Sequence, residues 1–233
     1  MAADHKTQQK GFRLRITLFL LGIVLFLIAL NVLNQAVNTL HELTRVEAER
    51  DQWQRPADVL QALDLKPGSI VVDLGSGAGY FALKISSSIG DRGEVLAVDL
   101  RRLSLTFLWI RSVLQHRHNV SVIVGEPGDP HLGTKVVDSV LVANTYHELE
   151  DSKTILNHIF RSLRPGGRLV IVDRGPASAD ANNAGLPSDA HEIAAGQVES
   201  ELARGGFSVV SRDPNFIDRP GDHWWLIVAQ KPQ

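Results

Sequence analysis

The sequence predicts an α/β fold with a doubly wound, mostly parallel sheet, carried behind one N-terminal hydrophobic helix. Short aliphatic runs alternate with helical segments from Ser69 onward, and a glycine-rich turn follows the first of these runs. Strands that are hydrophobic throughout and separated by helices are typical of a parallel sheet covered on both faces. A third observation adds the helix: residues 16–40 contain no charged side chain.

Length and composition limit the possible function classes. With 233 residues, 44% hydrophobic and 21% charged, the chain can form one packed domain plus an appendage. The net charge is −2, and basic residues predominate before residue 40, so the remainder is more acidic still. This balance disfavours a nucleic-acid partner. The chain has no cysteine, which excludes disulfides, thiolate zinc sites and cysteine nucleophiles.

The N-terminal segment predicts a single-pass membrane anchor. Residues 1–15 form a basic tail, and residues 16–38 are long and apolar enough to span a bilayer core of about 30 Å. A cleaved signal peptide is the main alternative, although the apolar stretch is long for one and residues 34–36 make a poor cleavage site. A buried core helix is a weaker alternative, because polar residues at helical spacing are almost absent between residues 16 and 30.

Two opposing indications leave undecided on which side of the membrane the rest of the chain lies. Four basic residues before the span favour a cytoplasmic N-terminus, which would place the rest of the chain outside. However, Arg45, Arg50 and Arg55 follow the span closely and weaken this bias. We interpret residues 39–55 as a charged, solvated stalk and residues 56–233 as the folded domain.

The expected elements follow in order. Pro56 suits the first turn of a short helix, and residues 66–68 break the chain before the first strand. The expected strands are 70–74, 94–99, 120–124, 138–143 and 168–172, and the helices between them are 80–89, 103–116 and 152–163.

The C-terminal part departs from this alternation. Residues 191–205 suggest a helix, and strands are expected at 207–211 and 224–229 with only a loop between them. Two such strands pair most easily antiparallel at a sheet edge. Of Trp224 and Trp225, we expect one to face the core and the other the edge.

The most informative motif joins the first strand to the following helix. Asp73 precedes three glycines at alternate positions, Gly75, Gly77 and Gly79. Glycines let the backbone turn sharply and approach a ligand closely, and the helix N-terminus offers free N–H groups. A nicotinamide site would place the third glycine one residue later, and Asp73 would repel a phosphate. The motif therefore favours a cationic ligand.

A second acidic residue completes this pattern. Asp99 ends the second strand, twenty positions after Gly79. In a doubly wound sheet, its carboxylate comes to lie beside the glycine turn, where it can accept hydrogen bonds from both hydroxyls of a ribose. The alternative is a capping residue for the helix that starts near Leu103.

Together these residues resemble the class I S-adenosylmethionine-dependent methyltransferases. The resemblance covers about residues 53–229 and includes the Leu163–Leu169 motif, Leu-Arg-Pro-Gly-Gly-Arg-Leu, before the fifth strand. It implies a Rossmann-like, seven-stranded sheet with an antiparallel last strand and S-adenosyl-L-methionine as cofactor. It also implies that Asp73 and the glycine turn surround the methionine part, and that Asp99 holds the ribose. Glu126 occupies the family's usual adenine-contacting position, and Asp129 is the alternative.

The segment after the fourth strand supplies the candidate catalytic residues. Asn144, a candidate cofactor contact, and the candidate catalytic residues Tyr146 and His147 should face the crevice that the carboxyl ends of the strands form. His147 is our candidate general base, since histidine titrates near neutral pH, and Tyr146 is a tentative second candidate. Packing at the rim is the alternative for both. Weaker candidates are Asp173, Arg174 and His191, and no group of residues has metal-ligand spacing.

The sequence thus predicts methyl transfer from S-adenosyl-L-methionine to a small-molecule or membrane-associated acceptor. The tether suggests a lipid-like acceptor such as a quinone. One alternative is a membrane-anchored S-adenosylmethionine-binding module without catalysis. Another is a nicotinamide-dependent reductase, which the position of the third glycine disfavours.

Overall fold

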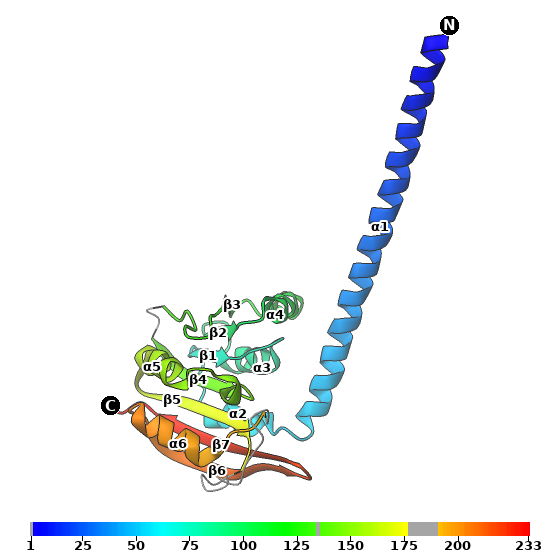
Figure 1. Ribbon diagram of the computed structural model, residues 1–233. Coiled ribbons are helices and arrows are strands. Elements are labelled where there is room, and N and C mark those ends of the chain that lie inside the picture. Colours follow the sequence, from blue (N-terminus) through cyan, green and yellow to red (C-terminus); the bar gives the residue numbers. More distant parts are fainter. Residues whose placement is uncertain (1, 134–135, 177–190) are drawn as a thin grey trace. The chain divides into compact units, whose positions relative to one another are not determined.

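The computed structural model describes residues 2–133, 136–176 and 191–233. Two compact units divide the chain, one of residues 1–46 and one of residues 47–233. The helix α1 (Ala2–Asp51) accounts for the first unit and contributes its last residues to the second (Figure 1). Within it, Thr17–Asp51 is long and apolar enough to cross a membrane, and none of its most apolar window is buried.

The second unit is built on a seven-stranded sheet with the order β3-β2-β1-β4-β5-β7-β6. The first five strands in chain order run parallel, and β7 pairs antiparallel with both β5 and β6. The sheet, the parallel strands and the antiparallel C-terminal pair confirm the predicted fold class. The strands are β1 (Ile70–Leu74), β2 (Glu94–Asp99), β3 (Val120–Val124), β4 (Val137–Ala143), β5 (Leu163–Arg174), β6 (Ser208–Arg219) and β7 (Asp222–Gln230).

Helices cover both faces of this sheet, as Figure 1 shows. Alternate residues of the central strands belong to two separate apolar clusters, because successive side chains of a strand point to opposite faces. One cluster contains α2 (Pro56–Ala62), α3 (Tyr80–Ile89) and α4 (Arg102–Leu114). The other contains α5 (Ser152–Ser162) and α6 (Ala195–Arg204). The covering on both faces explains why the inner strands are aliphatic at most positions.

Trp224 and Trp225 differ from the expectation. They point to opposite faces of β7, and both are buried, one in each apolar cluster. The edge strand on this side of the sheet is β6, so β7 is an inner strand with packed residues on both faces. The prediction that one of the two faces the edge is wrong for this reason.

The sheet topology determines where a ligand can bind. The chain runs outward from β1 through β2 to β3 and then crosses back to β4 on the other side of β1. In open α/β sheets, ligands bind outside the carboxyl ends of the strands at the point where the order reverses. Here that point lies between β1 and β4, which are paired from Val71 with Ser139 to Leu74 with Val142.

Candidate functional site

The glycine turn after β1 has two kinds of glycine. Gly75, Gly77 and Gly79 all have positive φ, at 79°, 54° and 98°. A Cβ on Gly75 would lie 2.1 Å from Oγ1 of Thr145, and one on Gly79 would lie 2.3 Å from Leu108. At Gly77, no described atom lies within 4 Å of an added Cβ. Gly75 and Gly79 therefore permit close packing, whereas Gly77 faces open space where a ligand can approach the backbone.

Asp73 is a buried carboxylate with an unused acceptor. Its side chain lies at the end of β1, 2% exposed, and its Oδ2 has no hydrogen-bond partner within the part of the chain that the structure describes. Burial raises its pKa to about 7, and the nearby charge of Asp99 adds to this, while the N–H of Ala82 and the charge of Arg50 act in the opposite direction. A cation beside Asp73 would supply the missing partner.

Asp99 holds the glycine turn at the end of β2. Its Oδ2 accepts a hydrogen bond from the backbone N–H of Gly77 at 2.8 Å, and its Oδ1 accepts one from the N–H of Arg101 at 2.8 Å. Asp99 does not cap α4, because Arg101 is the N-cap residue and no side chain caps that helix. An ionised carboxylate has about four acceptor positions, so Asp99 can take further donors.

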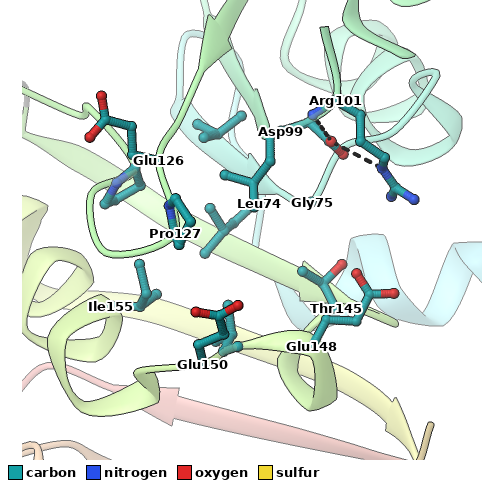
Figure 2. Close-up of a pocket in the computed structure, with 14 residues that line it drawn as sticks. Leu74, Gly75, Asp99, Arg101, Glu126, Pro127, Thr145, Glu148, Glu150 and Ile155 are labelled. Carbon is teal, nitrogen blue, oxygen red and sulfur yellow. Dashed lines mark hydrogen bonds and ion pairs between the residues drawn. The ribbon is translucent and has the colours of Figure 1, made fainter. Parts of the chain in front are cut away.

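A cavity of about 190 Å³ opens beside these residues. Leu74, Gly75 and Asp99 form one wall, and the segments after β3 and β4 form the others, as Figure 2 shows. Four carboxylates line it against one arginine, Arg101; these are Asp99, Glu126, Glu148 and Glu150. The field inside is therefore negative, which favours a cationic ligand over a dinucleotide with its pyrophosphate.

The structure separates the two acidic candidates after β3. Glu126 lines the cavity beside Pro127. Asp129 pairs with Glu126 through two backbone hydrogen bonds of 2.8 and 3.0 Å, and its carboxylate accepts the N–H of His131. Glu126 is thus brought to the cavity with Asp99, whereas the side chain of Asp129 is used in its own turn.

The candidates after β4 point in different directions. Asn144 adopts a positive φ of 53°, and its Oδ1 accepts a hydrogen bond from Nε of Arg174 at 3.1 Å. Tyr146 is 2% exposed and packs in an apolar cluster, and its hydroxyl donates to Glu201 at 2.7 Å. Because this hydroxyl is buried and already bonded to Glu201, Tyr146 is a poor candidate for a catalytic residue.

His147 forms a dyad with a buried carboxylate. Its Nδ1 lies 2.7 Å from Oδ1 of Asp173, which is fully buried at the end of β5. The backbone N–H of His147 also donates to Oδ2 of Asp173 at 3.1 Å. The hydrogen bond to Asp173 raises the pKa of His147, and burial partly offsets this effect. Nδ1 is therefore occupied, and Nε2 lies 3.8 Å from Glu148, which lines the cavity.

His191 also lies beside this dyad. Its ring packs edge-on against that of His147, with the ring centroids 5.8 Å apart. The structure thus brings together three residues that the sequence suggested separately, His147, Asp173 and His191. The helix expected from residue 191 begins only at Ala195.

The sequence reading missed a group of residues before the domain. Arg111 of α4 forms a bidentate ion pair with Glu47 and also donates to the carbonyl of Ala78 in the glycine turn. The guanidinium of Arg50 lies 3.9 Å from the centre of the Tyr80 ring, and its Nε donates to Gln54.

These contacts place residues 47–54 beside the glycine turn, rather than leaving them as a solvated stalk. Gln54 is 1% exposed, and its Nε2 has no partner among the described residues. Helical spacing was the available signal, since residues 47, 50, 51 and 54 share one face.

Comparisons with known proteins agree with this architecture. A family model described as a methyltransferase domain matches residues 65–206, more than half of the chain. The chain is 28% identical over 109 residues to an arsenite methyltransferase of Halobacterium salinarum, covering 47% of this chain and 28% of that protein. It is 29% identical over 112 residues to the ubiquinone/menaquinone biosynthesis C-methyltransferase UbiE of Vibrio campbellii, covering 46% and 42%.

Structural similarity extends further than these sequence matches. A SAM-dependent methyltransferase from Aquifex aeolicus superposes with a TM-score of 0.67 at 23% identity, covering 82% of this chain and 98% of that one. At this identity the likeness establishes the fold. The matched region spans less than half the length of both curated relatives.

Proposed function

The chain belongs to the class I S-adenosylmethionine-dependent methyltransferases, and from that premise we propose that it methylates a small, lipid-like acceptor at the carboxyl ends of β1, β2 and β4. The observation that carries the proposal is the unpartnered, buried Oδ2 of Asp73 beside the open glycine turn. When bound, S-adenosyl-L-methionine supplies an electrophilic methyl group on a positively charged sulfur. The acidic cavity suits such a cation.

The amino-acid end of the cofactor has complementary groups available. Asp73 offers a carboxylate to the ammonium group, and Arg50 offers a cation to the carboxylate. The charges of Asp73 and Arg50 interact with each other, so the two groups are close enough to bind neighbouring parts of one ligand. The unpartnered Nε2 of buried Gln54 adds a donor in the same segment. These residues fit a zwitterionic amino-acid moiety.

The nucleoside end has its own acceptors. Asp99 retains acceptor capacity for the ribose hydroxyls, and its two bonds to backbone N–H groups fix its orientation. Glu126 can accept from an exocyclic amine, and Pro127 and Leu100 offer apolar surface for a planar base. We therefore assign the glycine turn and Asp99 to the cofactor, with Glu126 as the adenine contact and Asn144 as a shaping residue of the crevice.

His147 is the proposed general base for the acceptor. Asp173 occupies Nδ1 and orients the ring, which leaves Nε2 to receive a proton from an O–H or N–H group as the methyl group is transferred. The raised pKa keeps His147 protonated to higher pH than an ordinary histidine. Base catalysis requires the neutral form, so activity should rise with pH through a midpoint above the ordinary value of about 6.5.

The acceptor is proposed to be lipid-like for two reasons. One matched relative is a methyltransferase of ubiquinone and menaquinone biosynthesis. Residues 16–38, which lie within the uncharged part of α1, have the length of a membrane anchor. We propose that these residues tether the protein and that residues 39–55 lead into the domain. An acceptor of the quinol class carries a long apolar tail, which suits a membrane-tethered enzyme, and a hydroxyl group, which can give its proton to His147.

A transfer assay tests the proposal. The full chain, reconstituted in lipid nanodiscs, is incubated with methyl-labelled S-adenosylmethionine and separately with lipid and aqueous extracts of membranes. Label should appear in the lipid fraction. His147→Gln should lower turnover by about 10²–10⁴ with cofactor affinity unchanged, while His223→Gln, an exposed histidine of β7, should not change it. Binding of S-adenosylhomocysteine without transfer to either extract would favour a non-catalytic binding module instead.

A further inference from the structure

An unusual surface lies on α4, on the side that faces away from the sheet. The inner side of this helix buries Leu105, Leu108, Arg111 and Ser112. The outer side would normally be polar in a helix that covers a sheet. Instead it exposes large apolar side chains, each at least half exposed; with Leu100, just before the helix, these are Leu103, Trp109, Val113 and Leu114. We call these five residues the α4 face.

Helical spacing arranges four of these side chains in two adjacent stripes, Leu103 with Leu114 and Trp109 with Val113. Leu103, Ile110 and Leu114 are seven and four residues apart and form one stripe along the helix. Ile110 is partly exposed within that stripe. The neighbouring edge strand β3 adds Val122 and Val124, which are 37% and 39% exposed. A helix that is apolar on both sides, next to an apolar strand, indicates a surface that contacts something other than water.

The charges around the α4 face indicate what it contacts. Residues 100–118 contain four arginines and two histidines but no aspartate or glutamate. Arg111 points inward to Glu47 and is not available to a partner. The exposed Arg101 and Arg102 lie at one end of the patch, between Leu100 and Leu103, and Nε of Arg101 also donates to Asp99 at 3.3 Å. The half-buried Arg117, with exposed histidines on either side, follows the patch. A helix with Trp and Leu on its surface and arginines at its borders has the composition of an interfacial membrane helix.

We propose that the α4 face docks onto the surface of a bilayer containing anionic lipids. Leu103, Trp109 and Leu114 would enter the boundary between headgroups and acyl chains, and Arg101 and Arg102 would contact lipid phosphates. A second copy of the chain is a poorer occupant. Packing of this face against itself would bring the same arginines together without any acidic partner.

This contact is separate from the proposed anchor and has a consequence for the cavity. Leu100 and Arg101 belong both to the border of the α4 face and to the wall of the cofactor cavity. Docking would therefore hold that wall at the lipid surface. The inference does not require that the chain transfers methyl groups, because it rests on the outer surface of α4 alone.

The absence of cysteine allows a site-specific test in the full chain. Leu114→Cys is labelled with an environment-sensitive fluorophore, and the protein is reconstituted into vesicles that carry a quencher on their acyl chains. The control is Ser200→Cys, an exposed residue of α6 on the opposite face of the sheet. In vesicles of mixed phosphatidylcholine and phosphatidylglycerol, the label at residue 114 should lose most of its emission and the label at residue 200 should not.

Two further arms examine the role of charge. The label at residue 114 should regain much of its emission in vesicles of phosphatidylcholine alone. It should also do so in the exposed-site variant Arg102→Glu. In both cases the electrostatic attraction between the α4 face and the lipid headgroups is reduced. Melting temperatures of the labelled proteins should agree, which excludes unfolding as the cause.

Three results would overturn the proposal. Equal emission from the two labelled positions would show that the α4 face does not meet lipid. Equal quenching in both kinds of vesicle would show that anionic lipid is not recognised. A disulfide-linked dimer of Leu114→Cys without quenching would assign the surface to a second copy of the chain.

Discussion

Binding of the cofactor should release a proton from Asp73. Burial raises the pKa of this carboxyl group to about 7, so it is mostly protonated at pH 6 before the ligand binds. An ammonium group placed beside Oδ2 stabilises the ionised form and returns the pKa towards its ordinary value of about 3.9. The proton therefore leaves on binding. About 0.9 proton per cofactor should be released at pH 6 and about 0.1 at pH 8.

The same shift determines the pH dependence of affinity. Affinity should reach its maximum above pH 7 and decrease as the pH falls through that value, approaching tenfold per pH unit below pH 6, or about 50-fold from pH 7 to pH 5. Calorimetric titration with S-adenosylhomocysteine, which keeps the ammonium group, measures proton release when repeated in buffers of different ionisation enthalpy. Asp73→Asn should bind weakly and without proton release.

A matched control separates Asp73 from the other group that titrates nearby. His147→Gln removes the histidine of raised pKa but leaves Asp73 unchanged, so its proton release at pH 6 should equal that of the wild type. If the wild type binds S-adenosylhomocysteine without proton release at pH 6, Asp73 does not contact the cation. If the release disappears in His147→Gln, the released proton comes from His147 and not from Asp73.

Three other predictions follow from the site and the segment before it. Asp99→Ala should weaken S-adenosylhomocysteine binding at least about tenfold in calorimetry, because a charged acceptor is lost; unchanged affinity would remove Asp99 from the ribose site. Gly77→Val should abolish S-adenosylhomocysteine binding, because the added side chain enters the open space beside the glycine turn. Its positive φ should lower the free energy of unfolding by about 1–2 kcal/mol in thermal melting. Normal affinity would place the ligand elsewhere. A chain starting at Glu42 should fold and be released from the membrane fraction by high salt without detergent, because only the peripheral contact remains. A chain starting at Gln52 should be about 3–5 kcal/mol less stable, because Arg111 loses its carboxylate partner; equal melting temperatures of the two chains would contradict this.

Much of the fold could be predicted because its signals are local. The inner strands are aliphatic at successive positions, and β1, β2 and β3 have the predicted limits. β6 is longer than predicted, at Ser208–Arg219, because pairing with β7 extends it through polar residues that carry no strand pattern. Asp73 and Asp99 were found from their positions at strand ends, which fix their place in any doubly wound sheet.

The rest of the site depends on contacts between distant segments. The pair of Glu47 and Arg111 joins positions 64 residues apart, and nothing in either segment alone indicates the other. Tyr146 and His147 were predicted to face the crevice together. The structure places them in a short 3₁₀ turn (Tyr146–Glu148), where adjacent side chains diverge, so that Tyr146 enters the core and His147 meets Asp173.

Cofactor choice is the central claim, and one comparison tests it most directly. The full chain in detergent micelles is titrated at pH 8 with S-adenosylhomocysteine and, separately, with reduced nicotinamide adenine dinucleotide. The acidic cavity and the unpartnered Asp73 predict saturable binding of one S-adenosylhomocysteine per chain and no measurable binding of the dinucleotide. Saturable binding of the dinucleotide, with none of S-adenosylhomocysteine, would contradict the account.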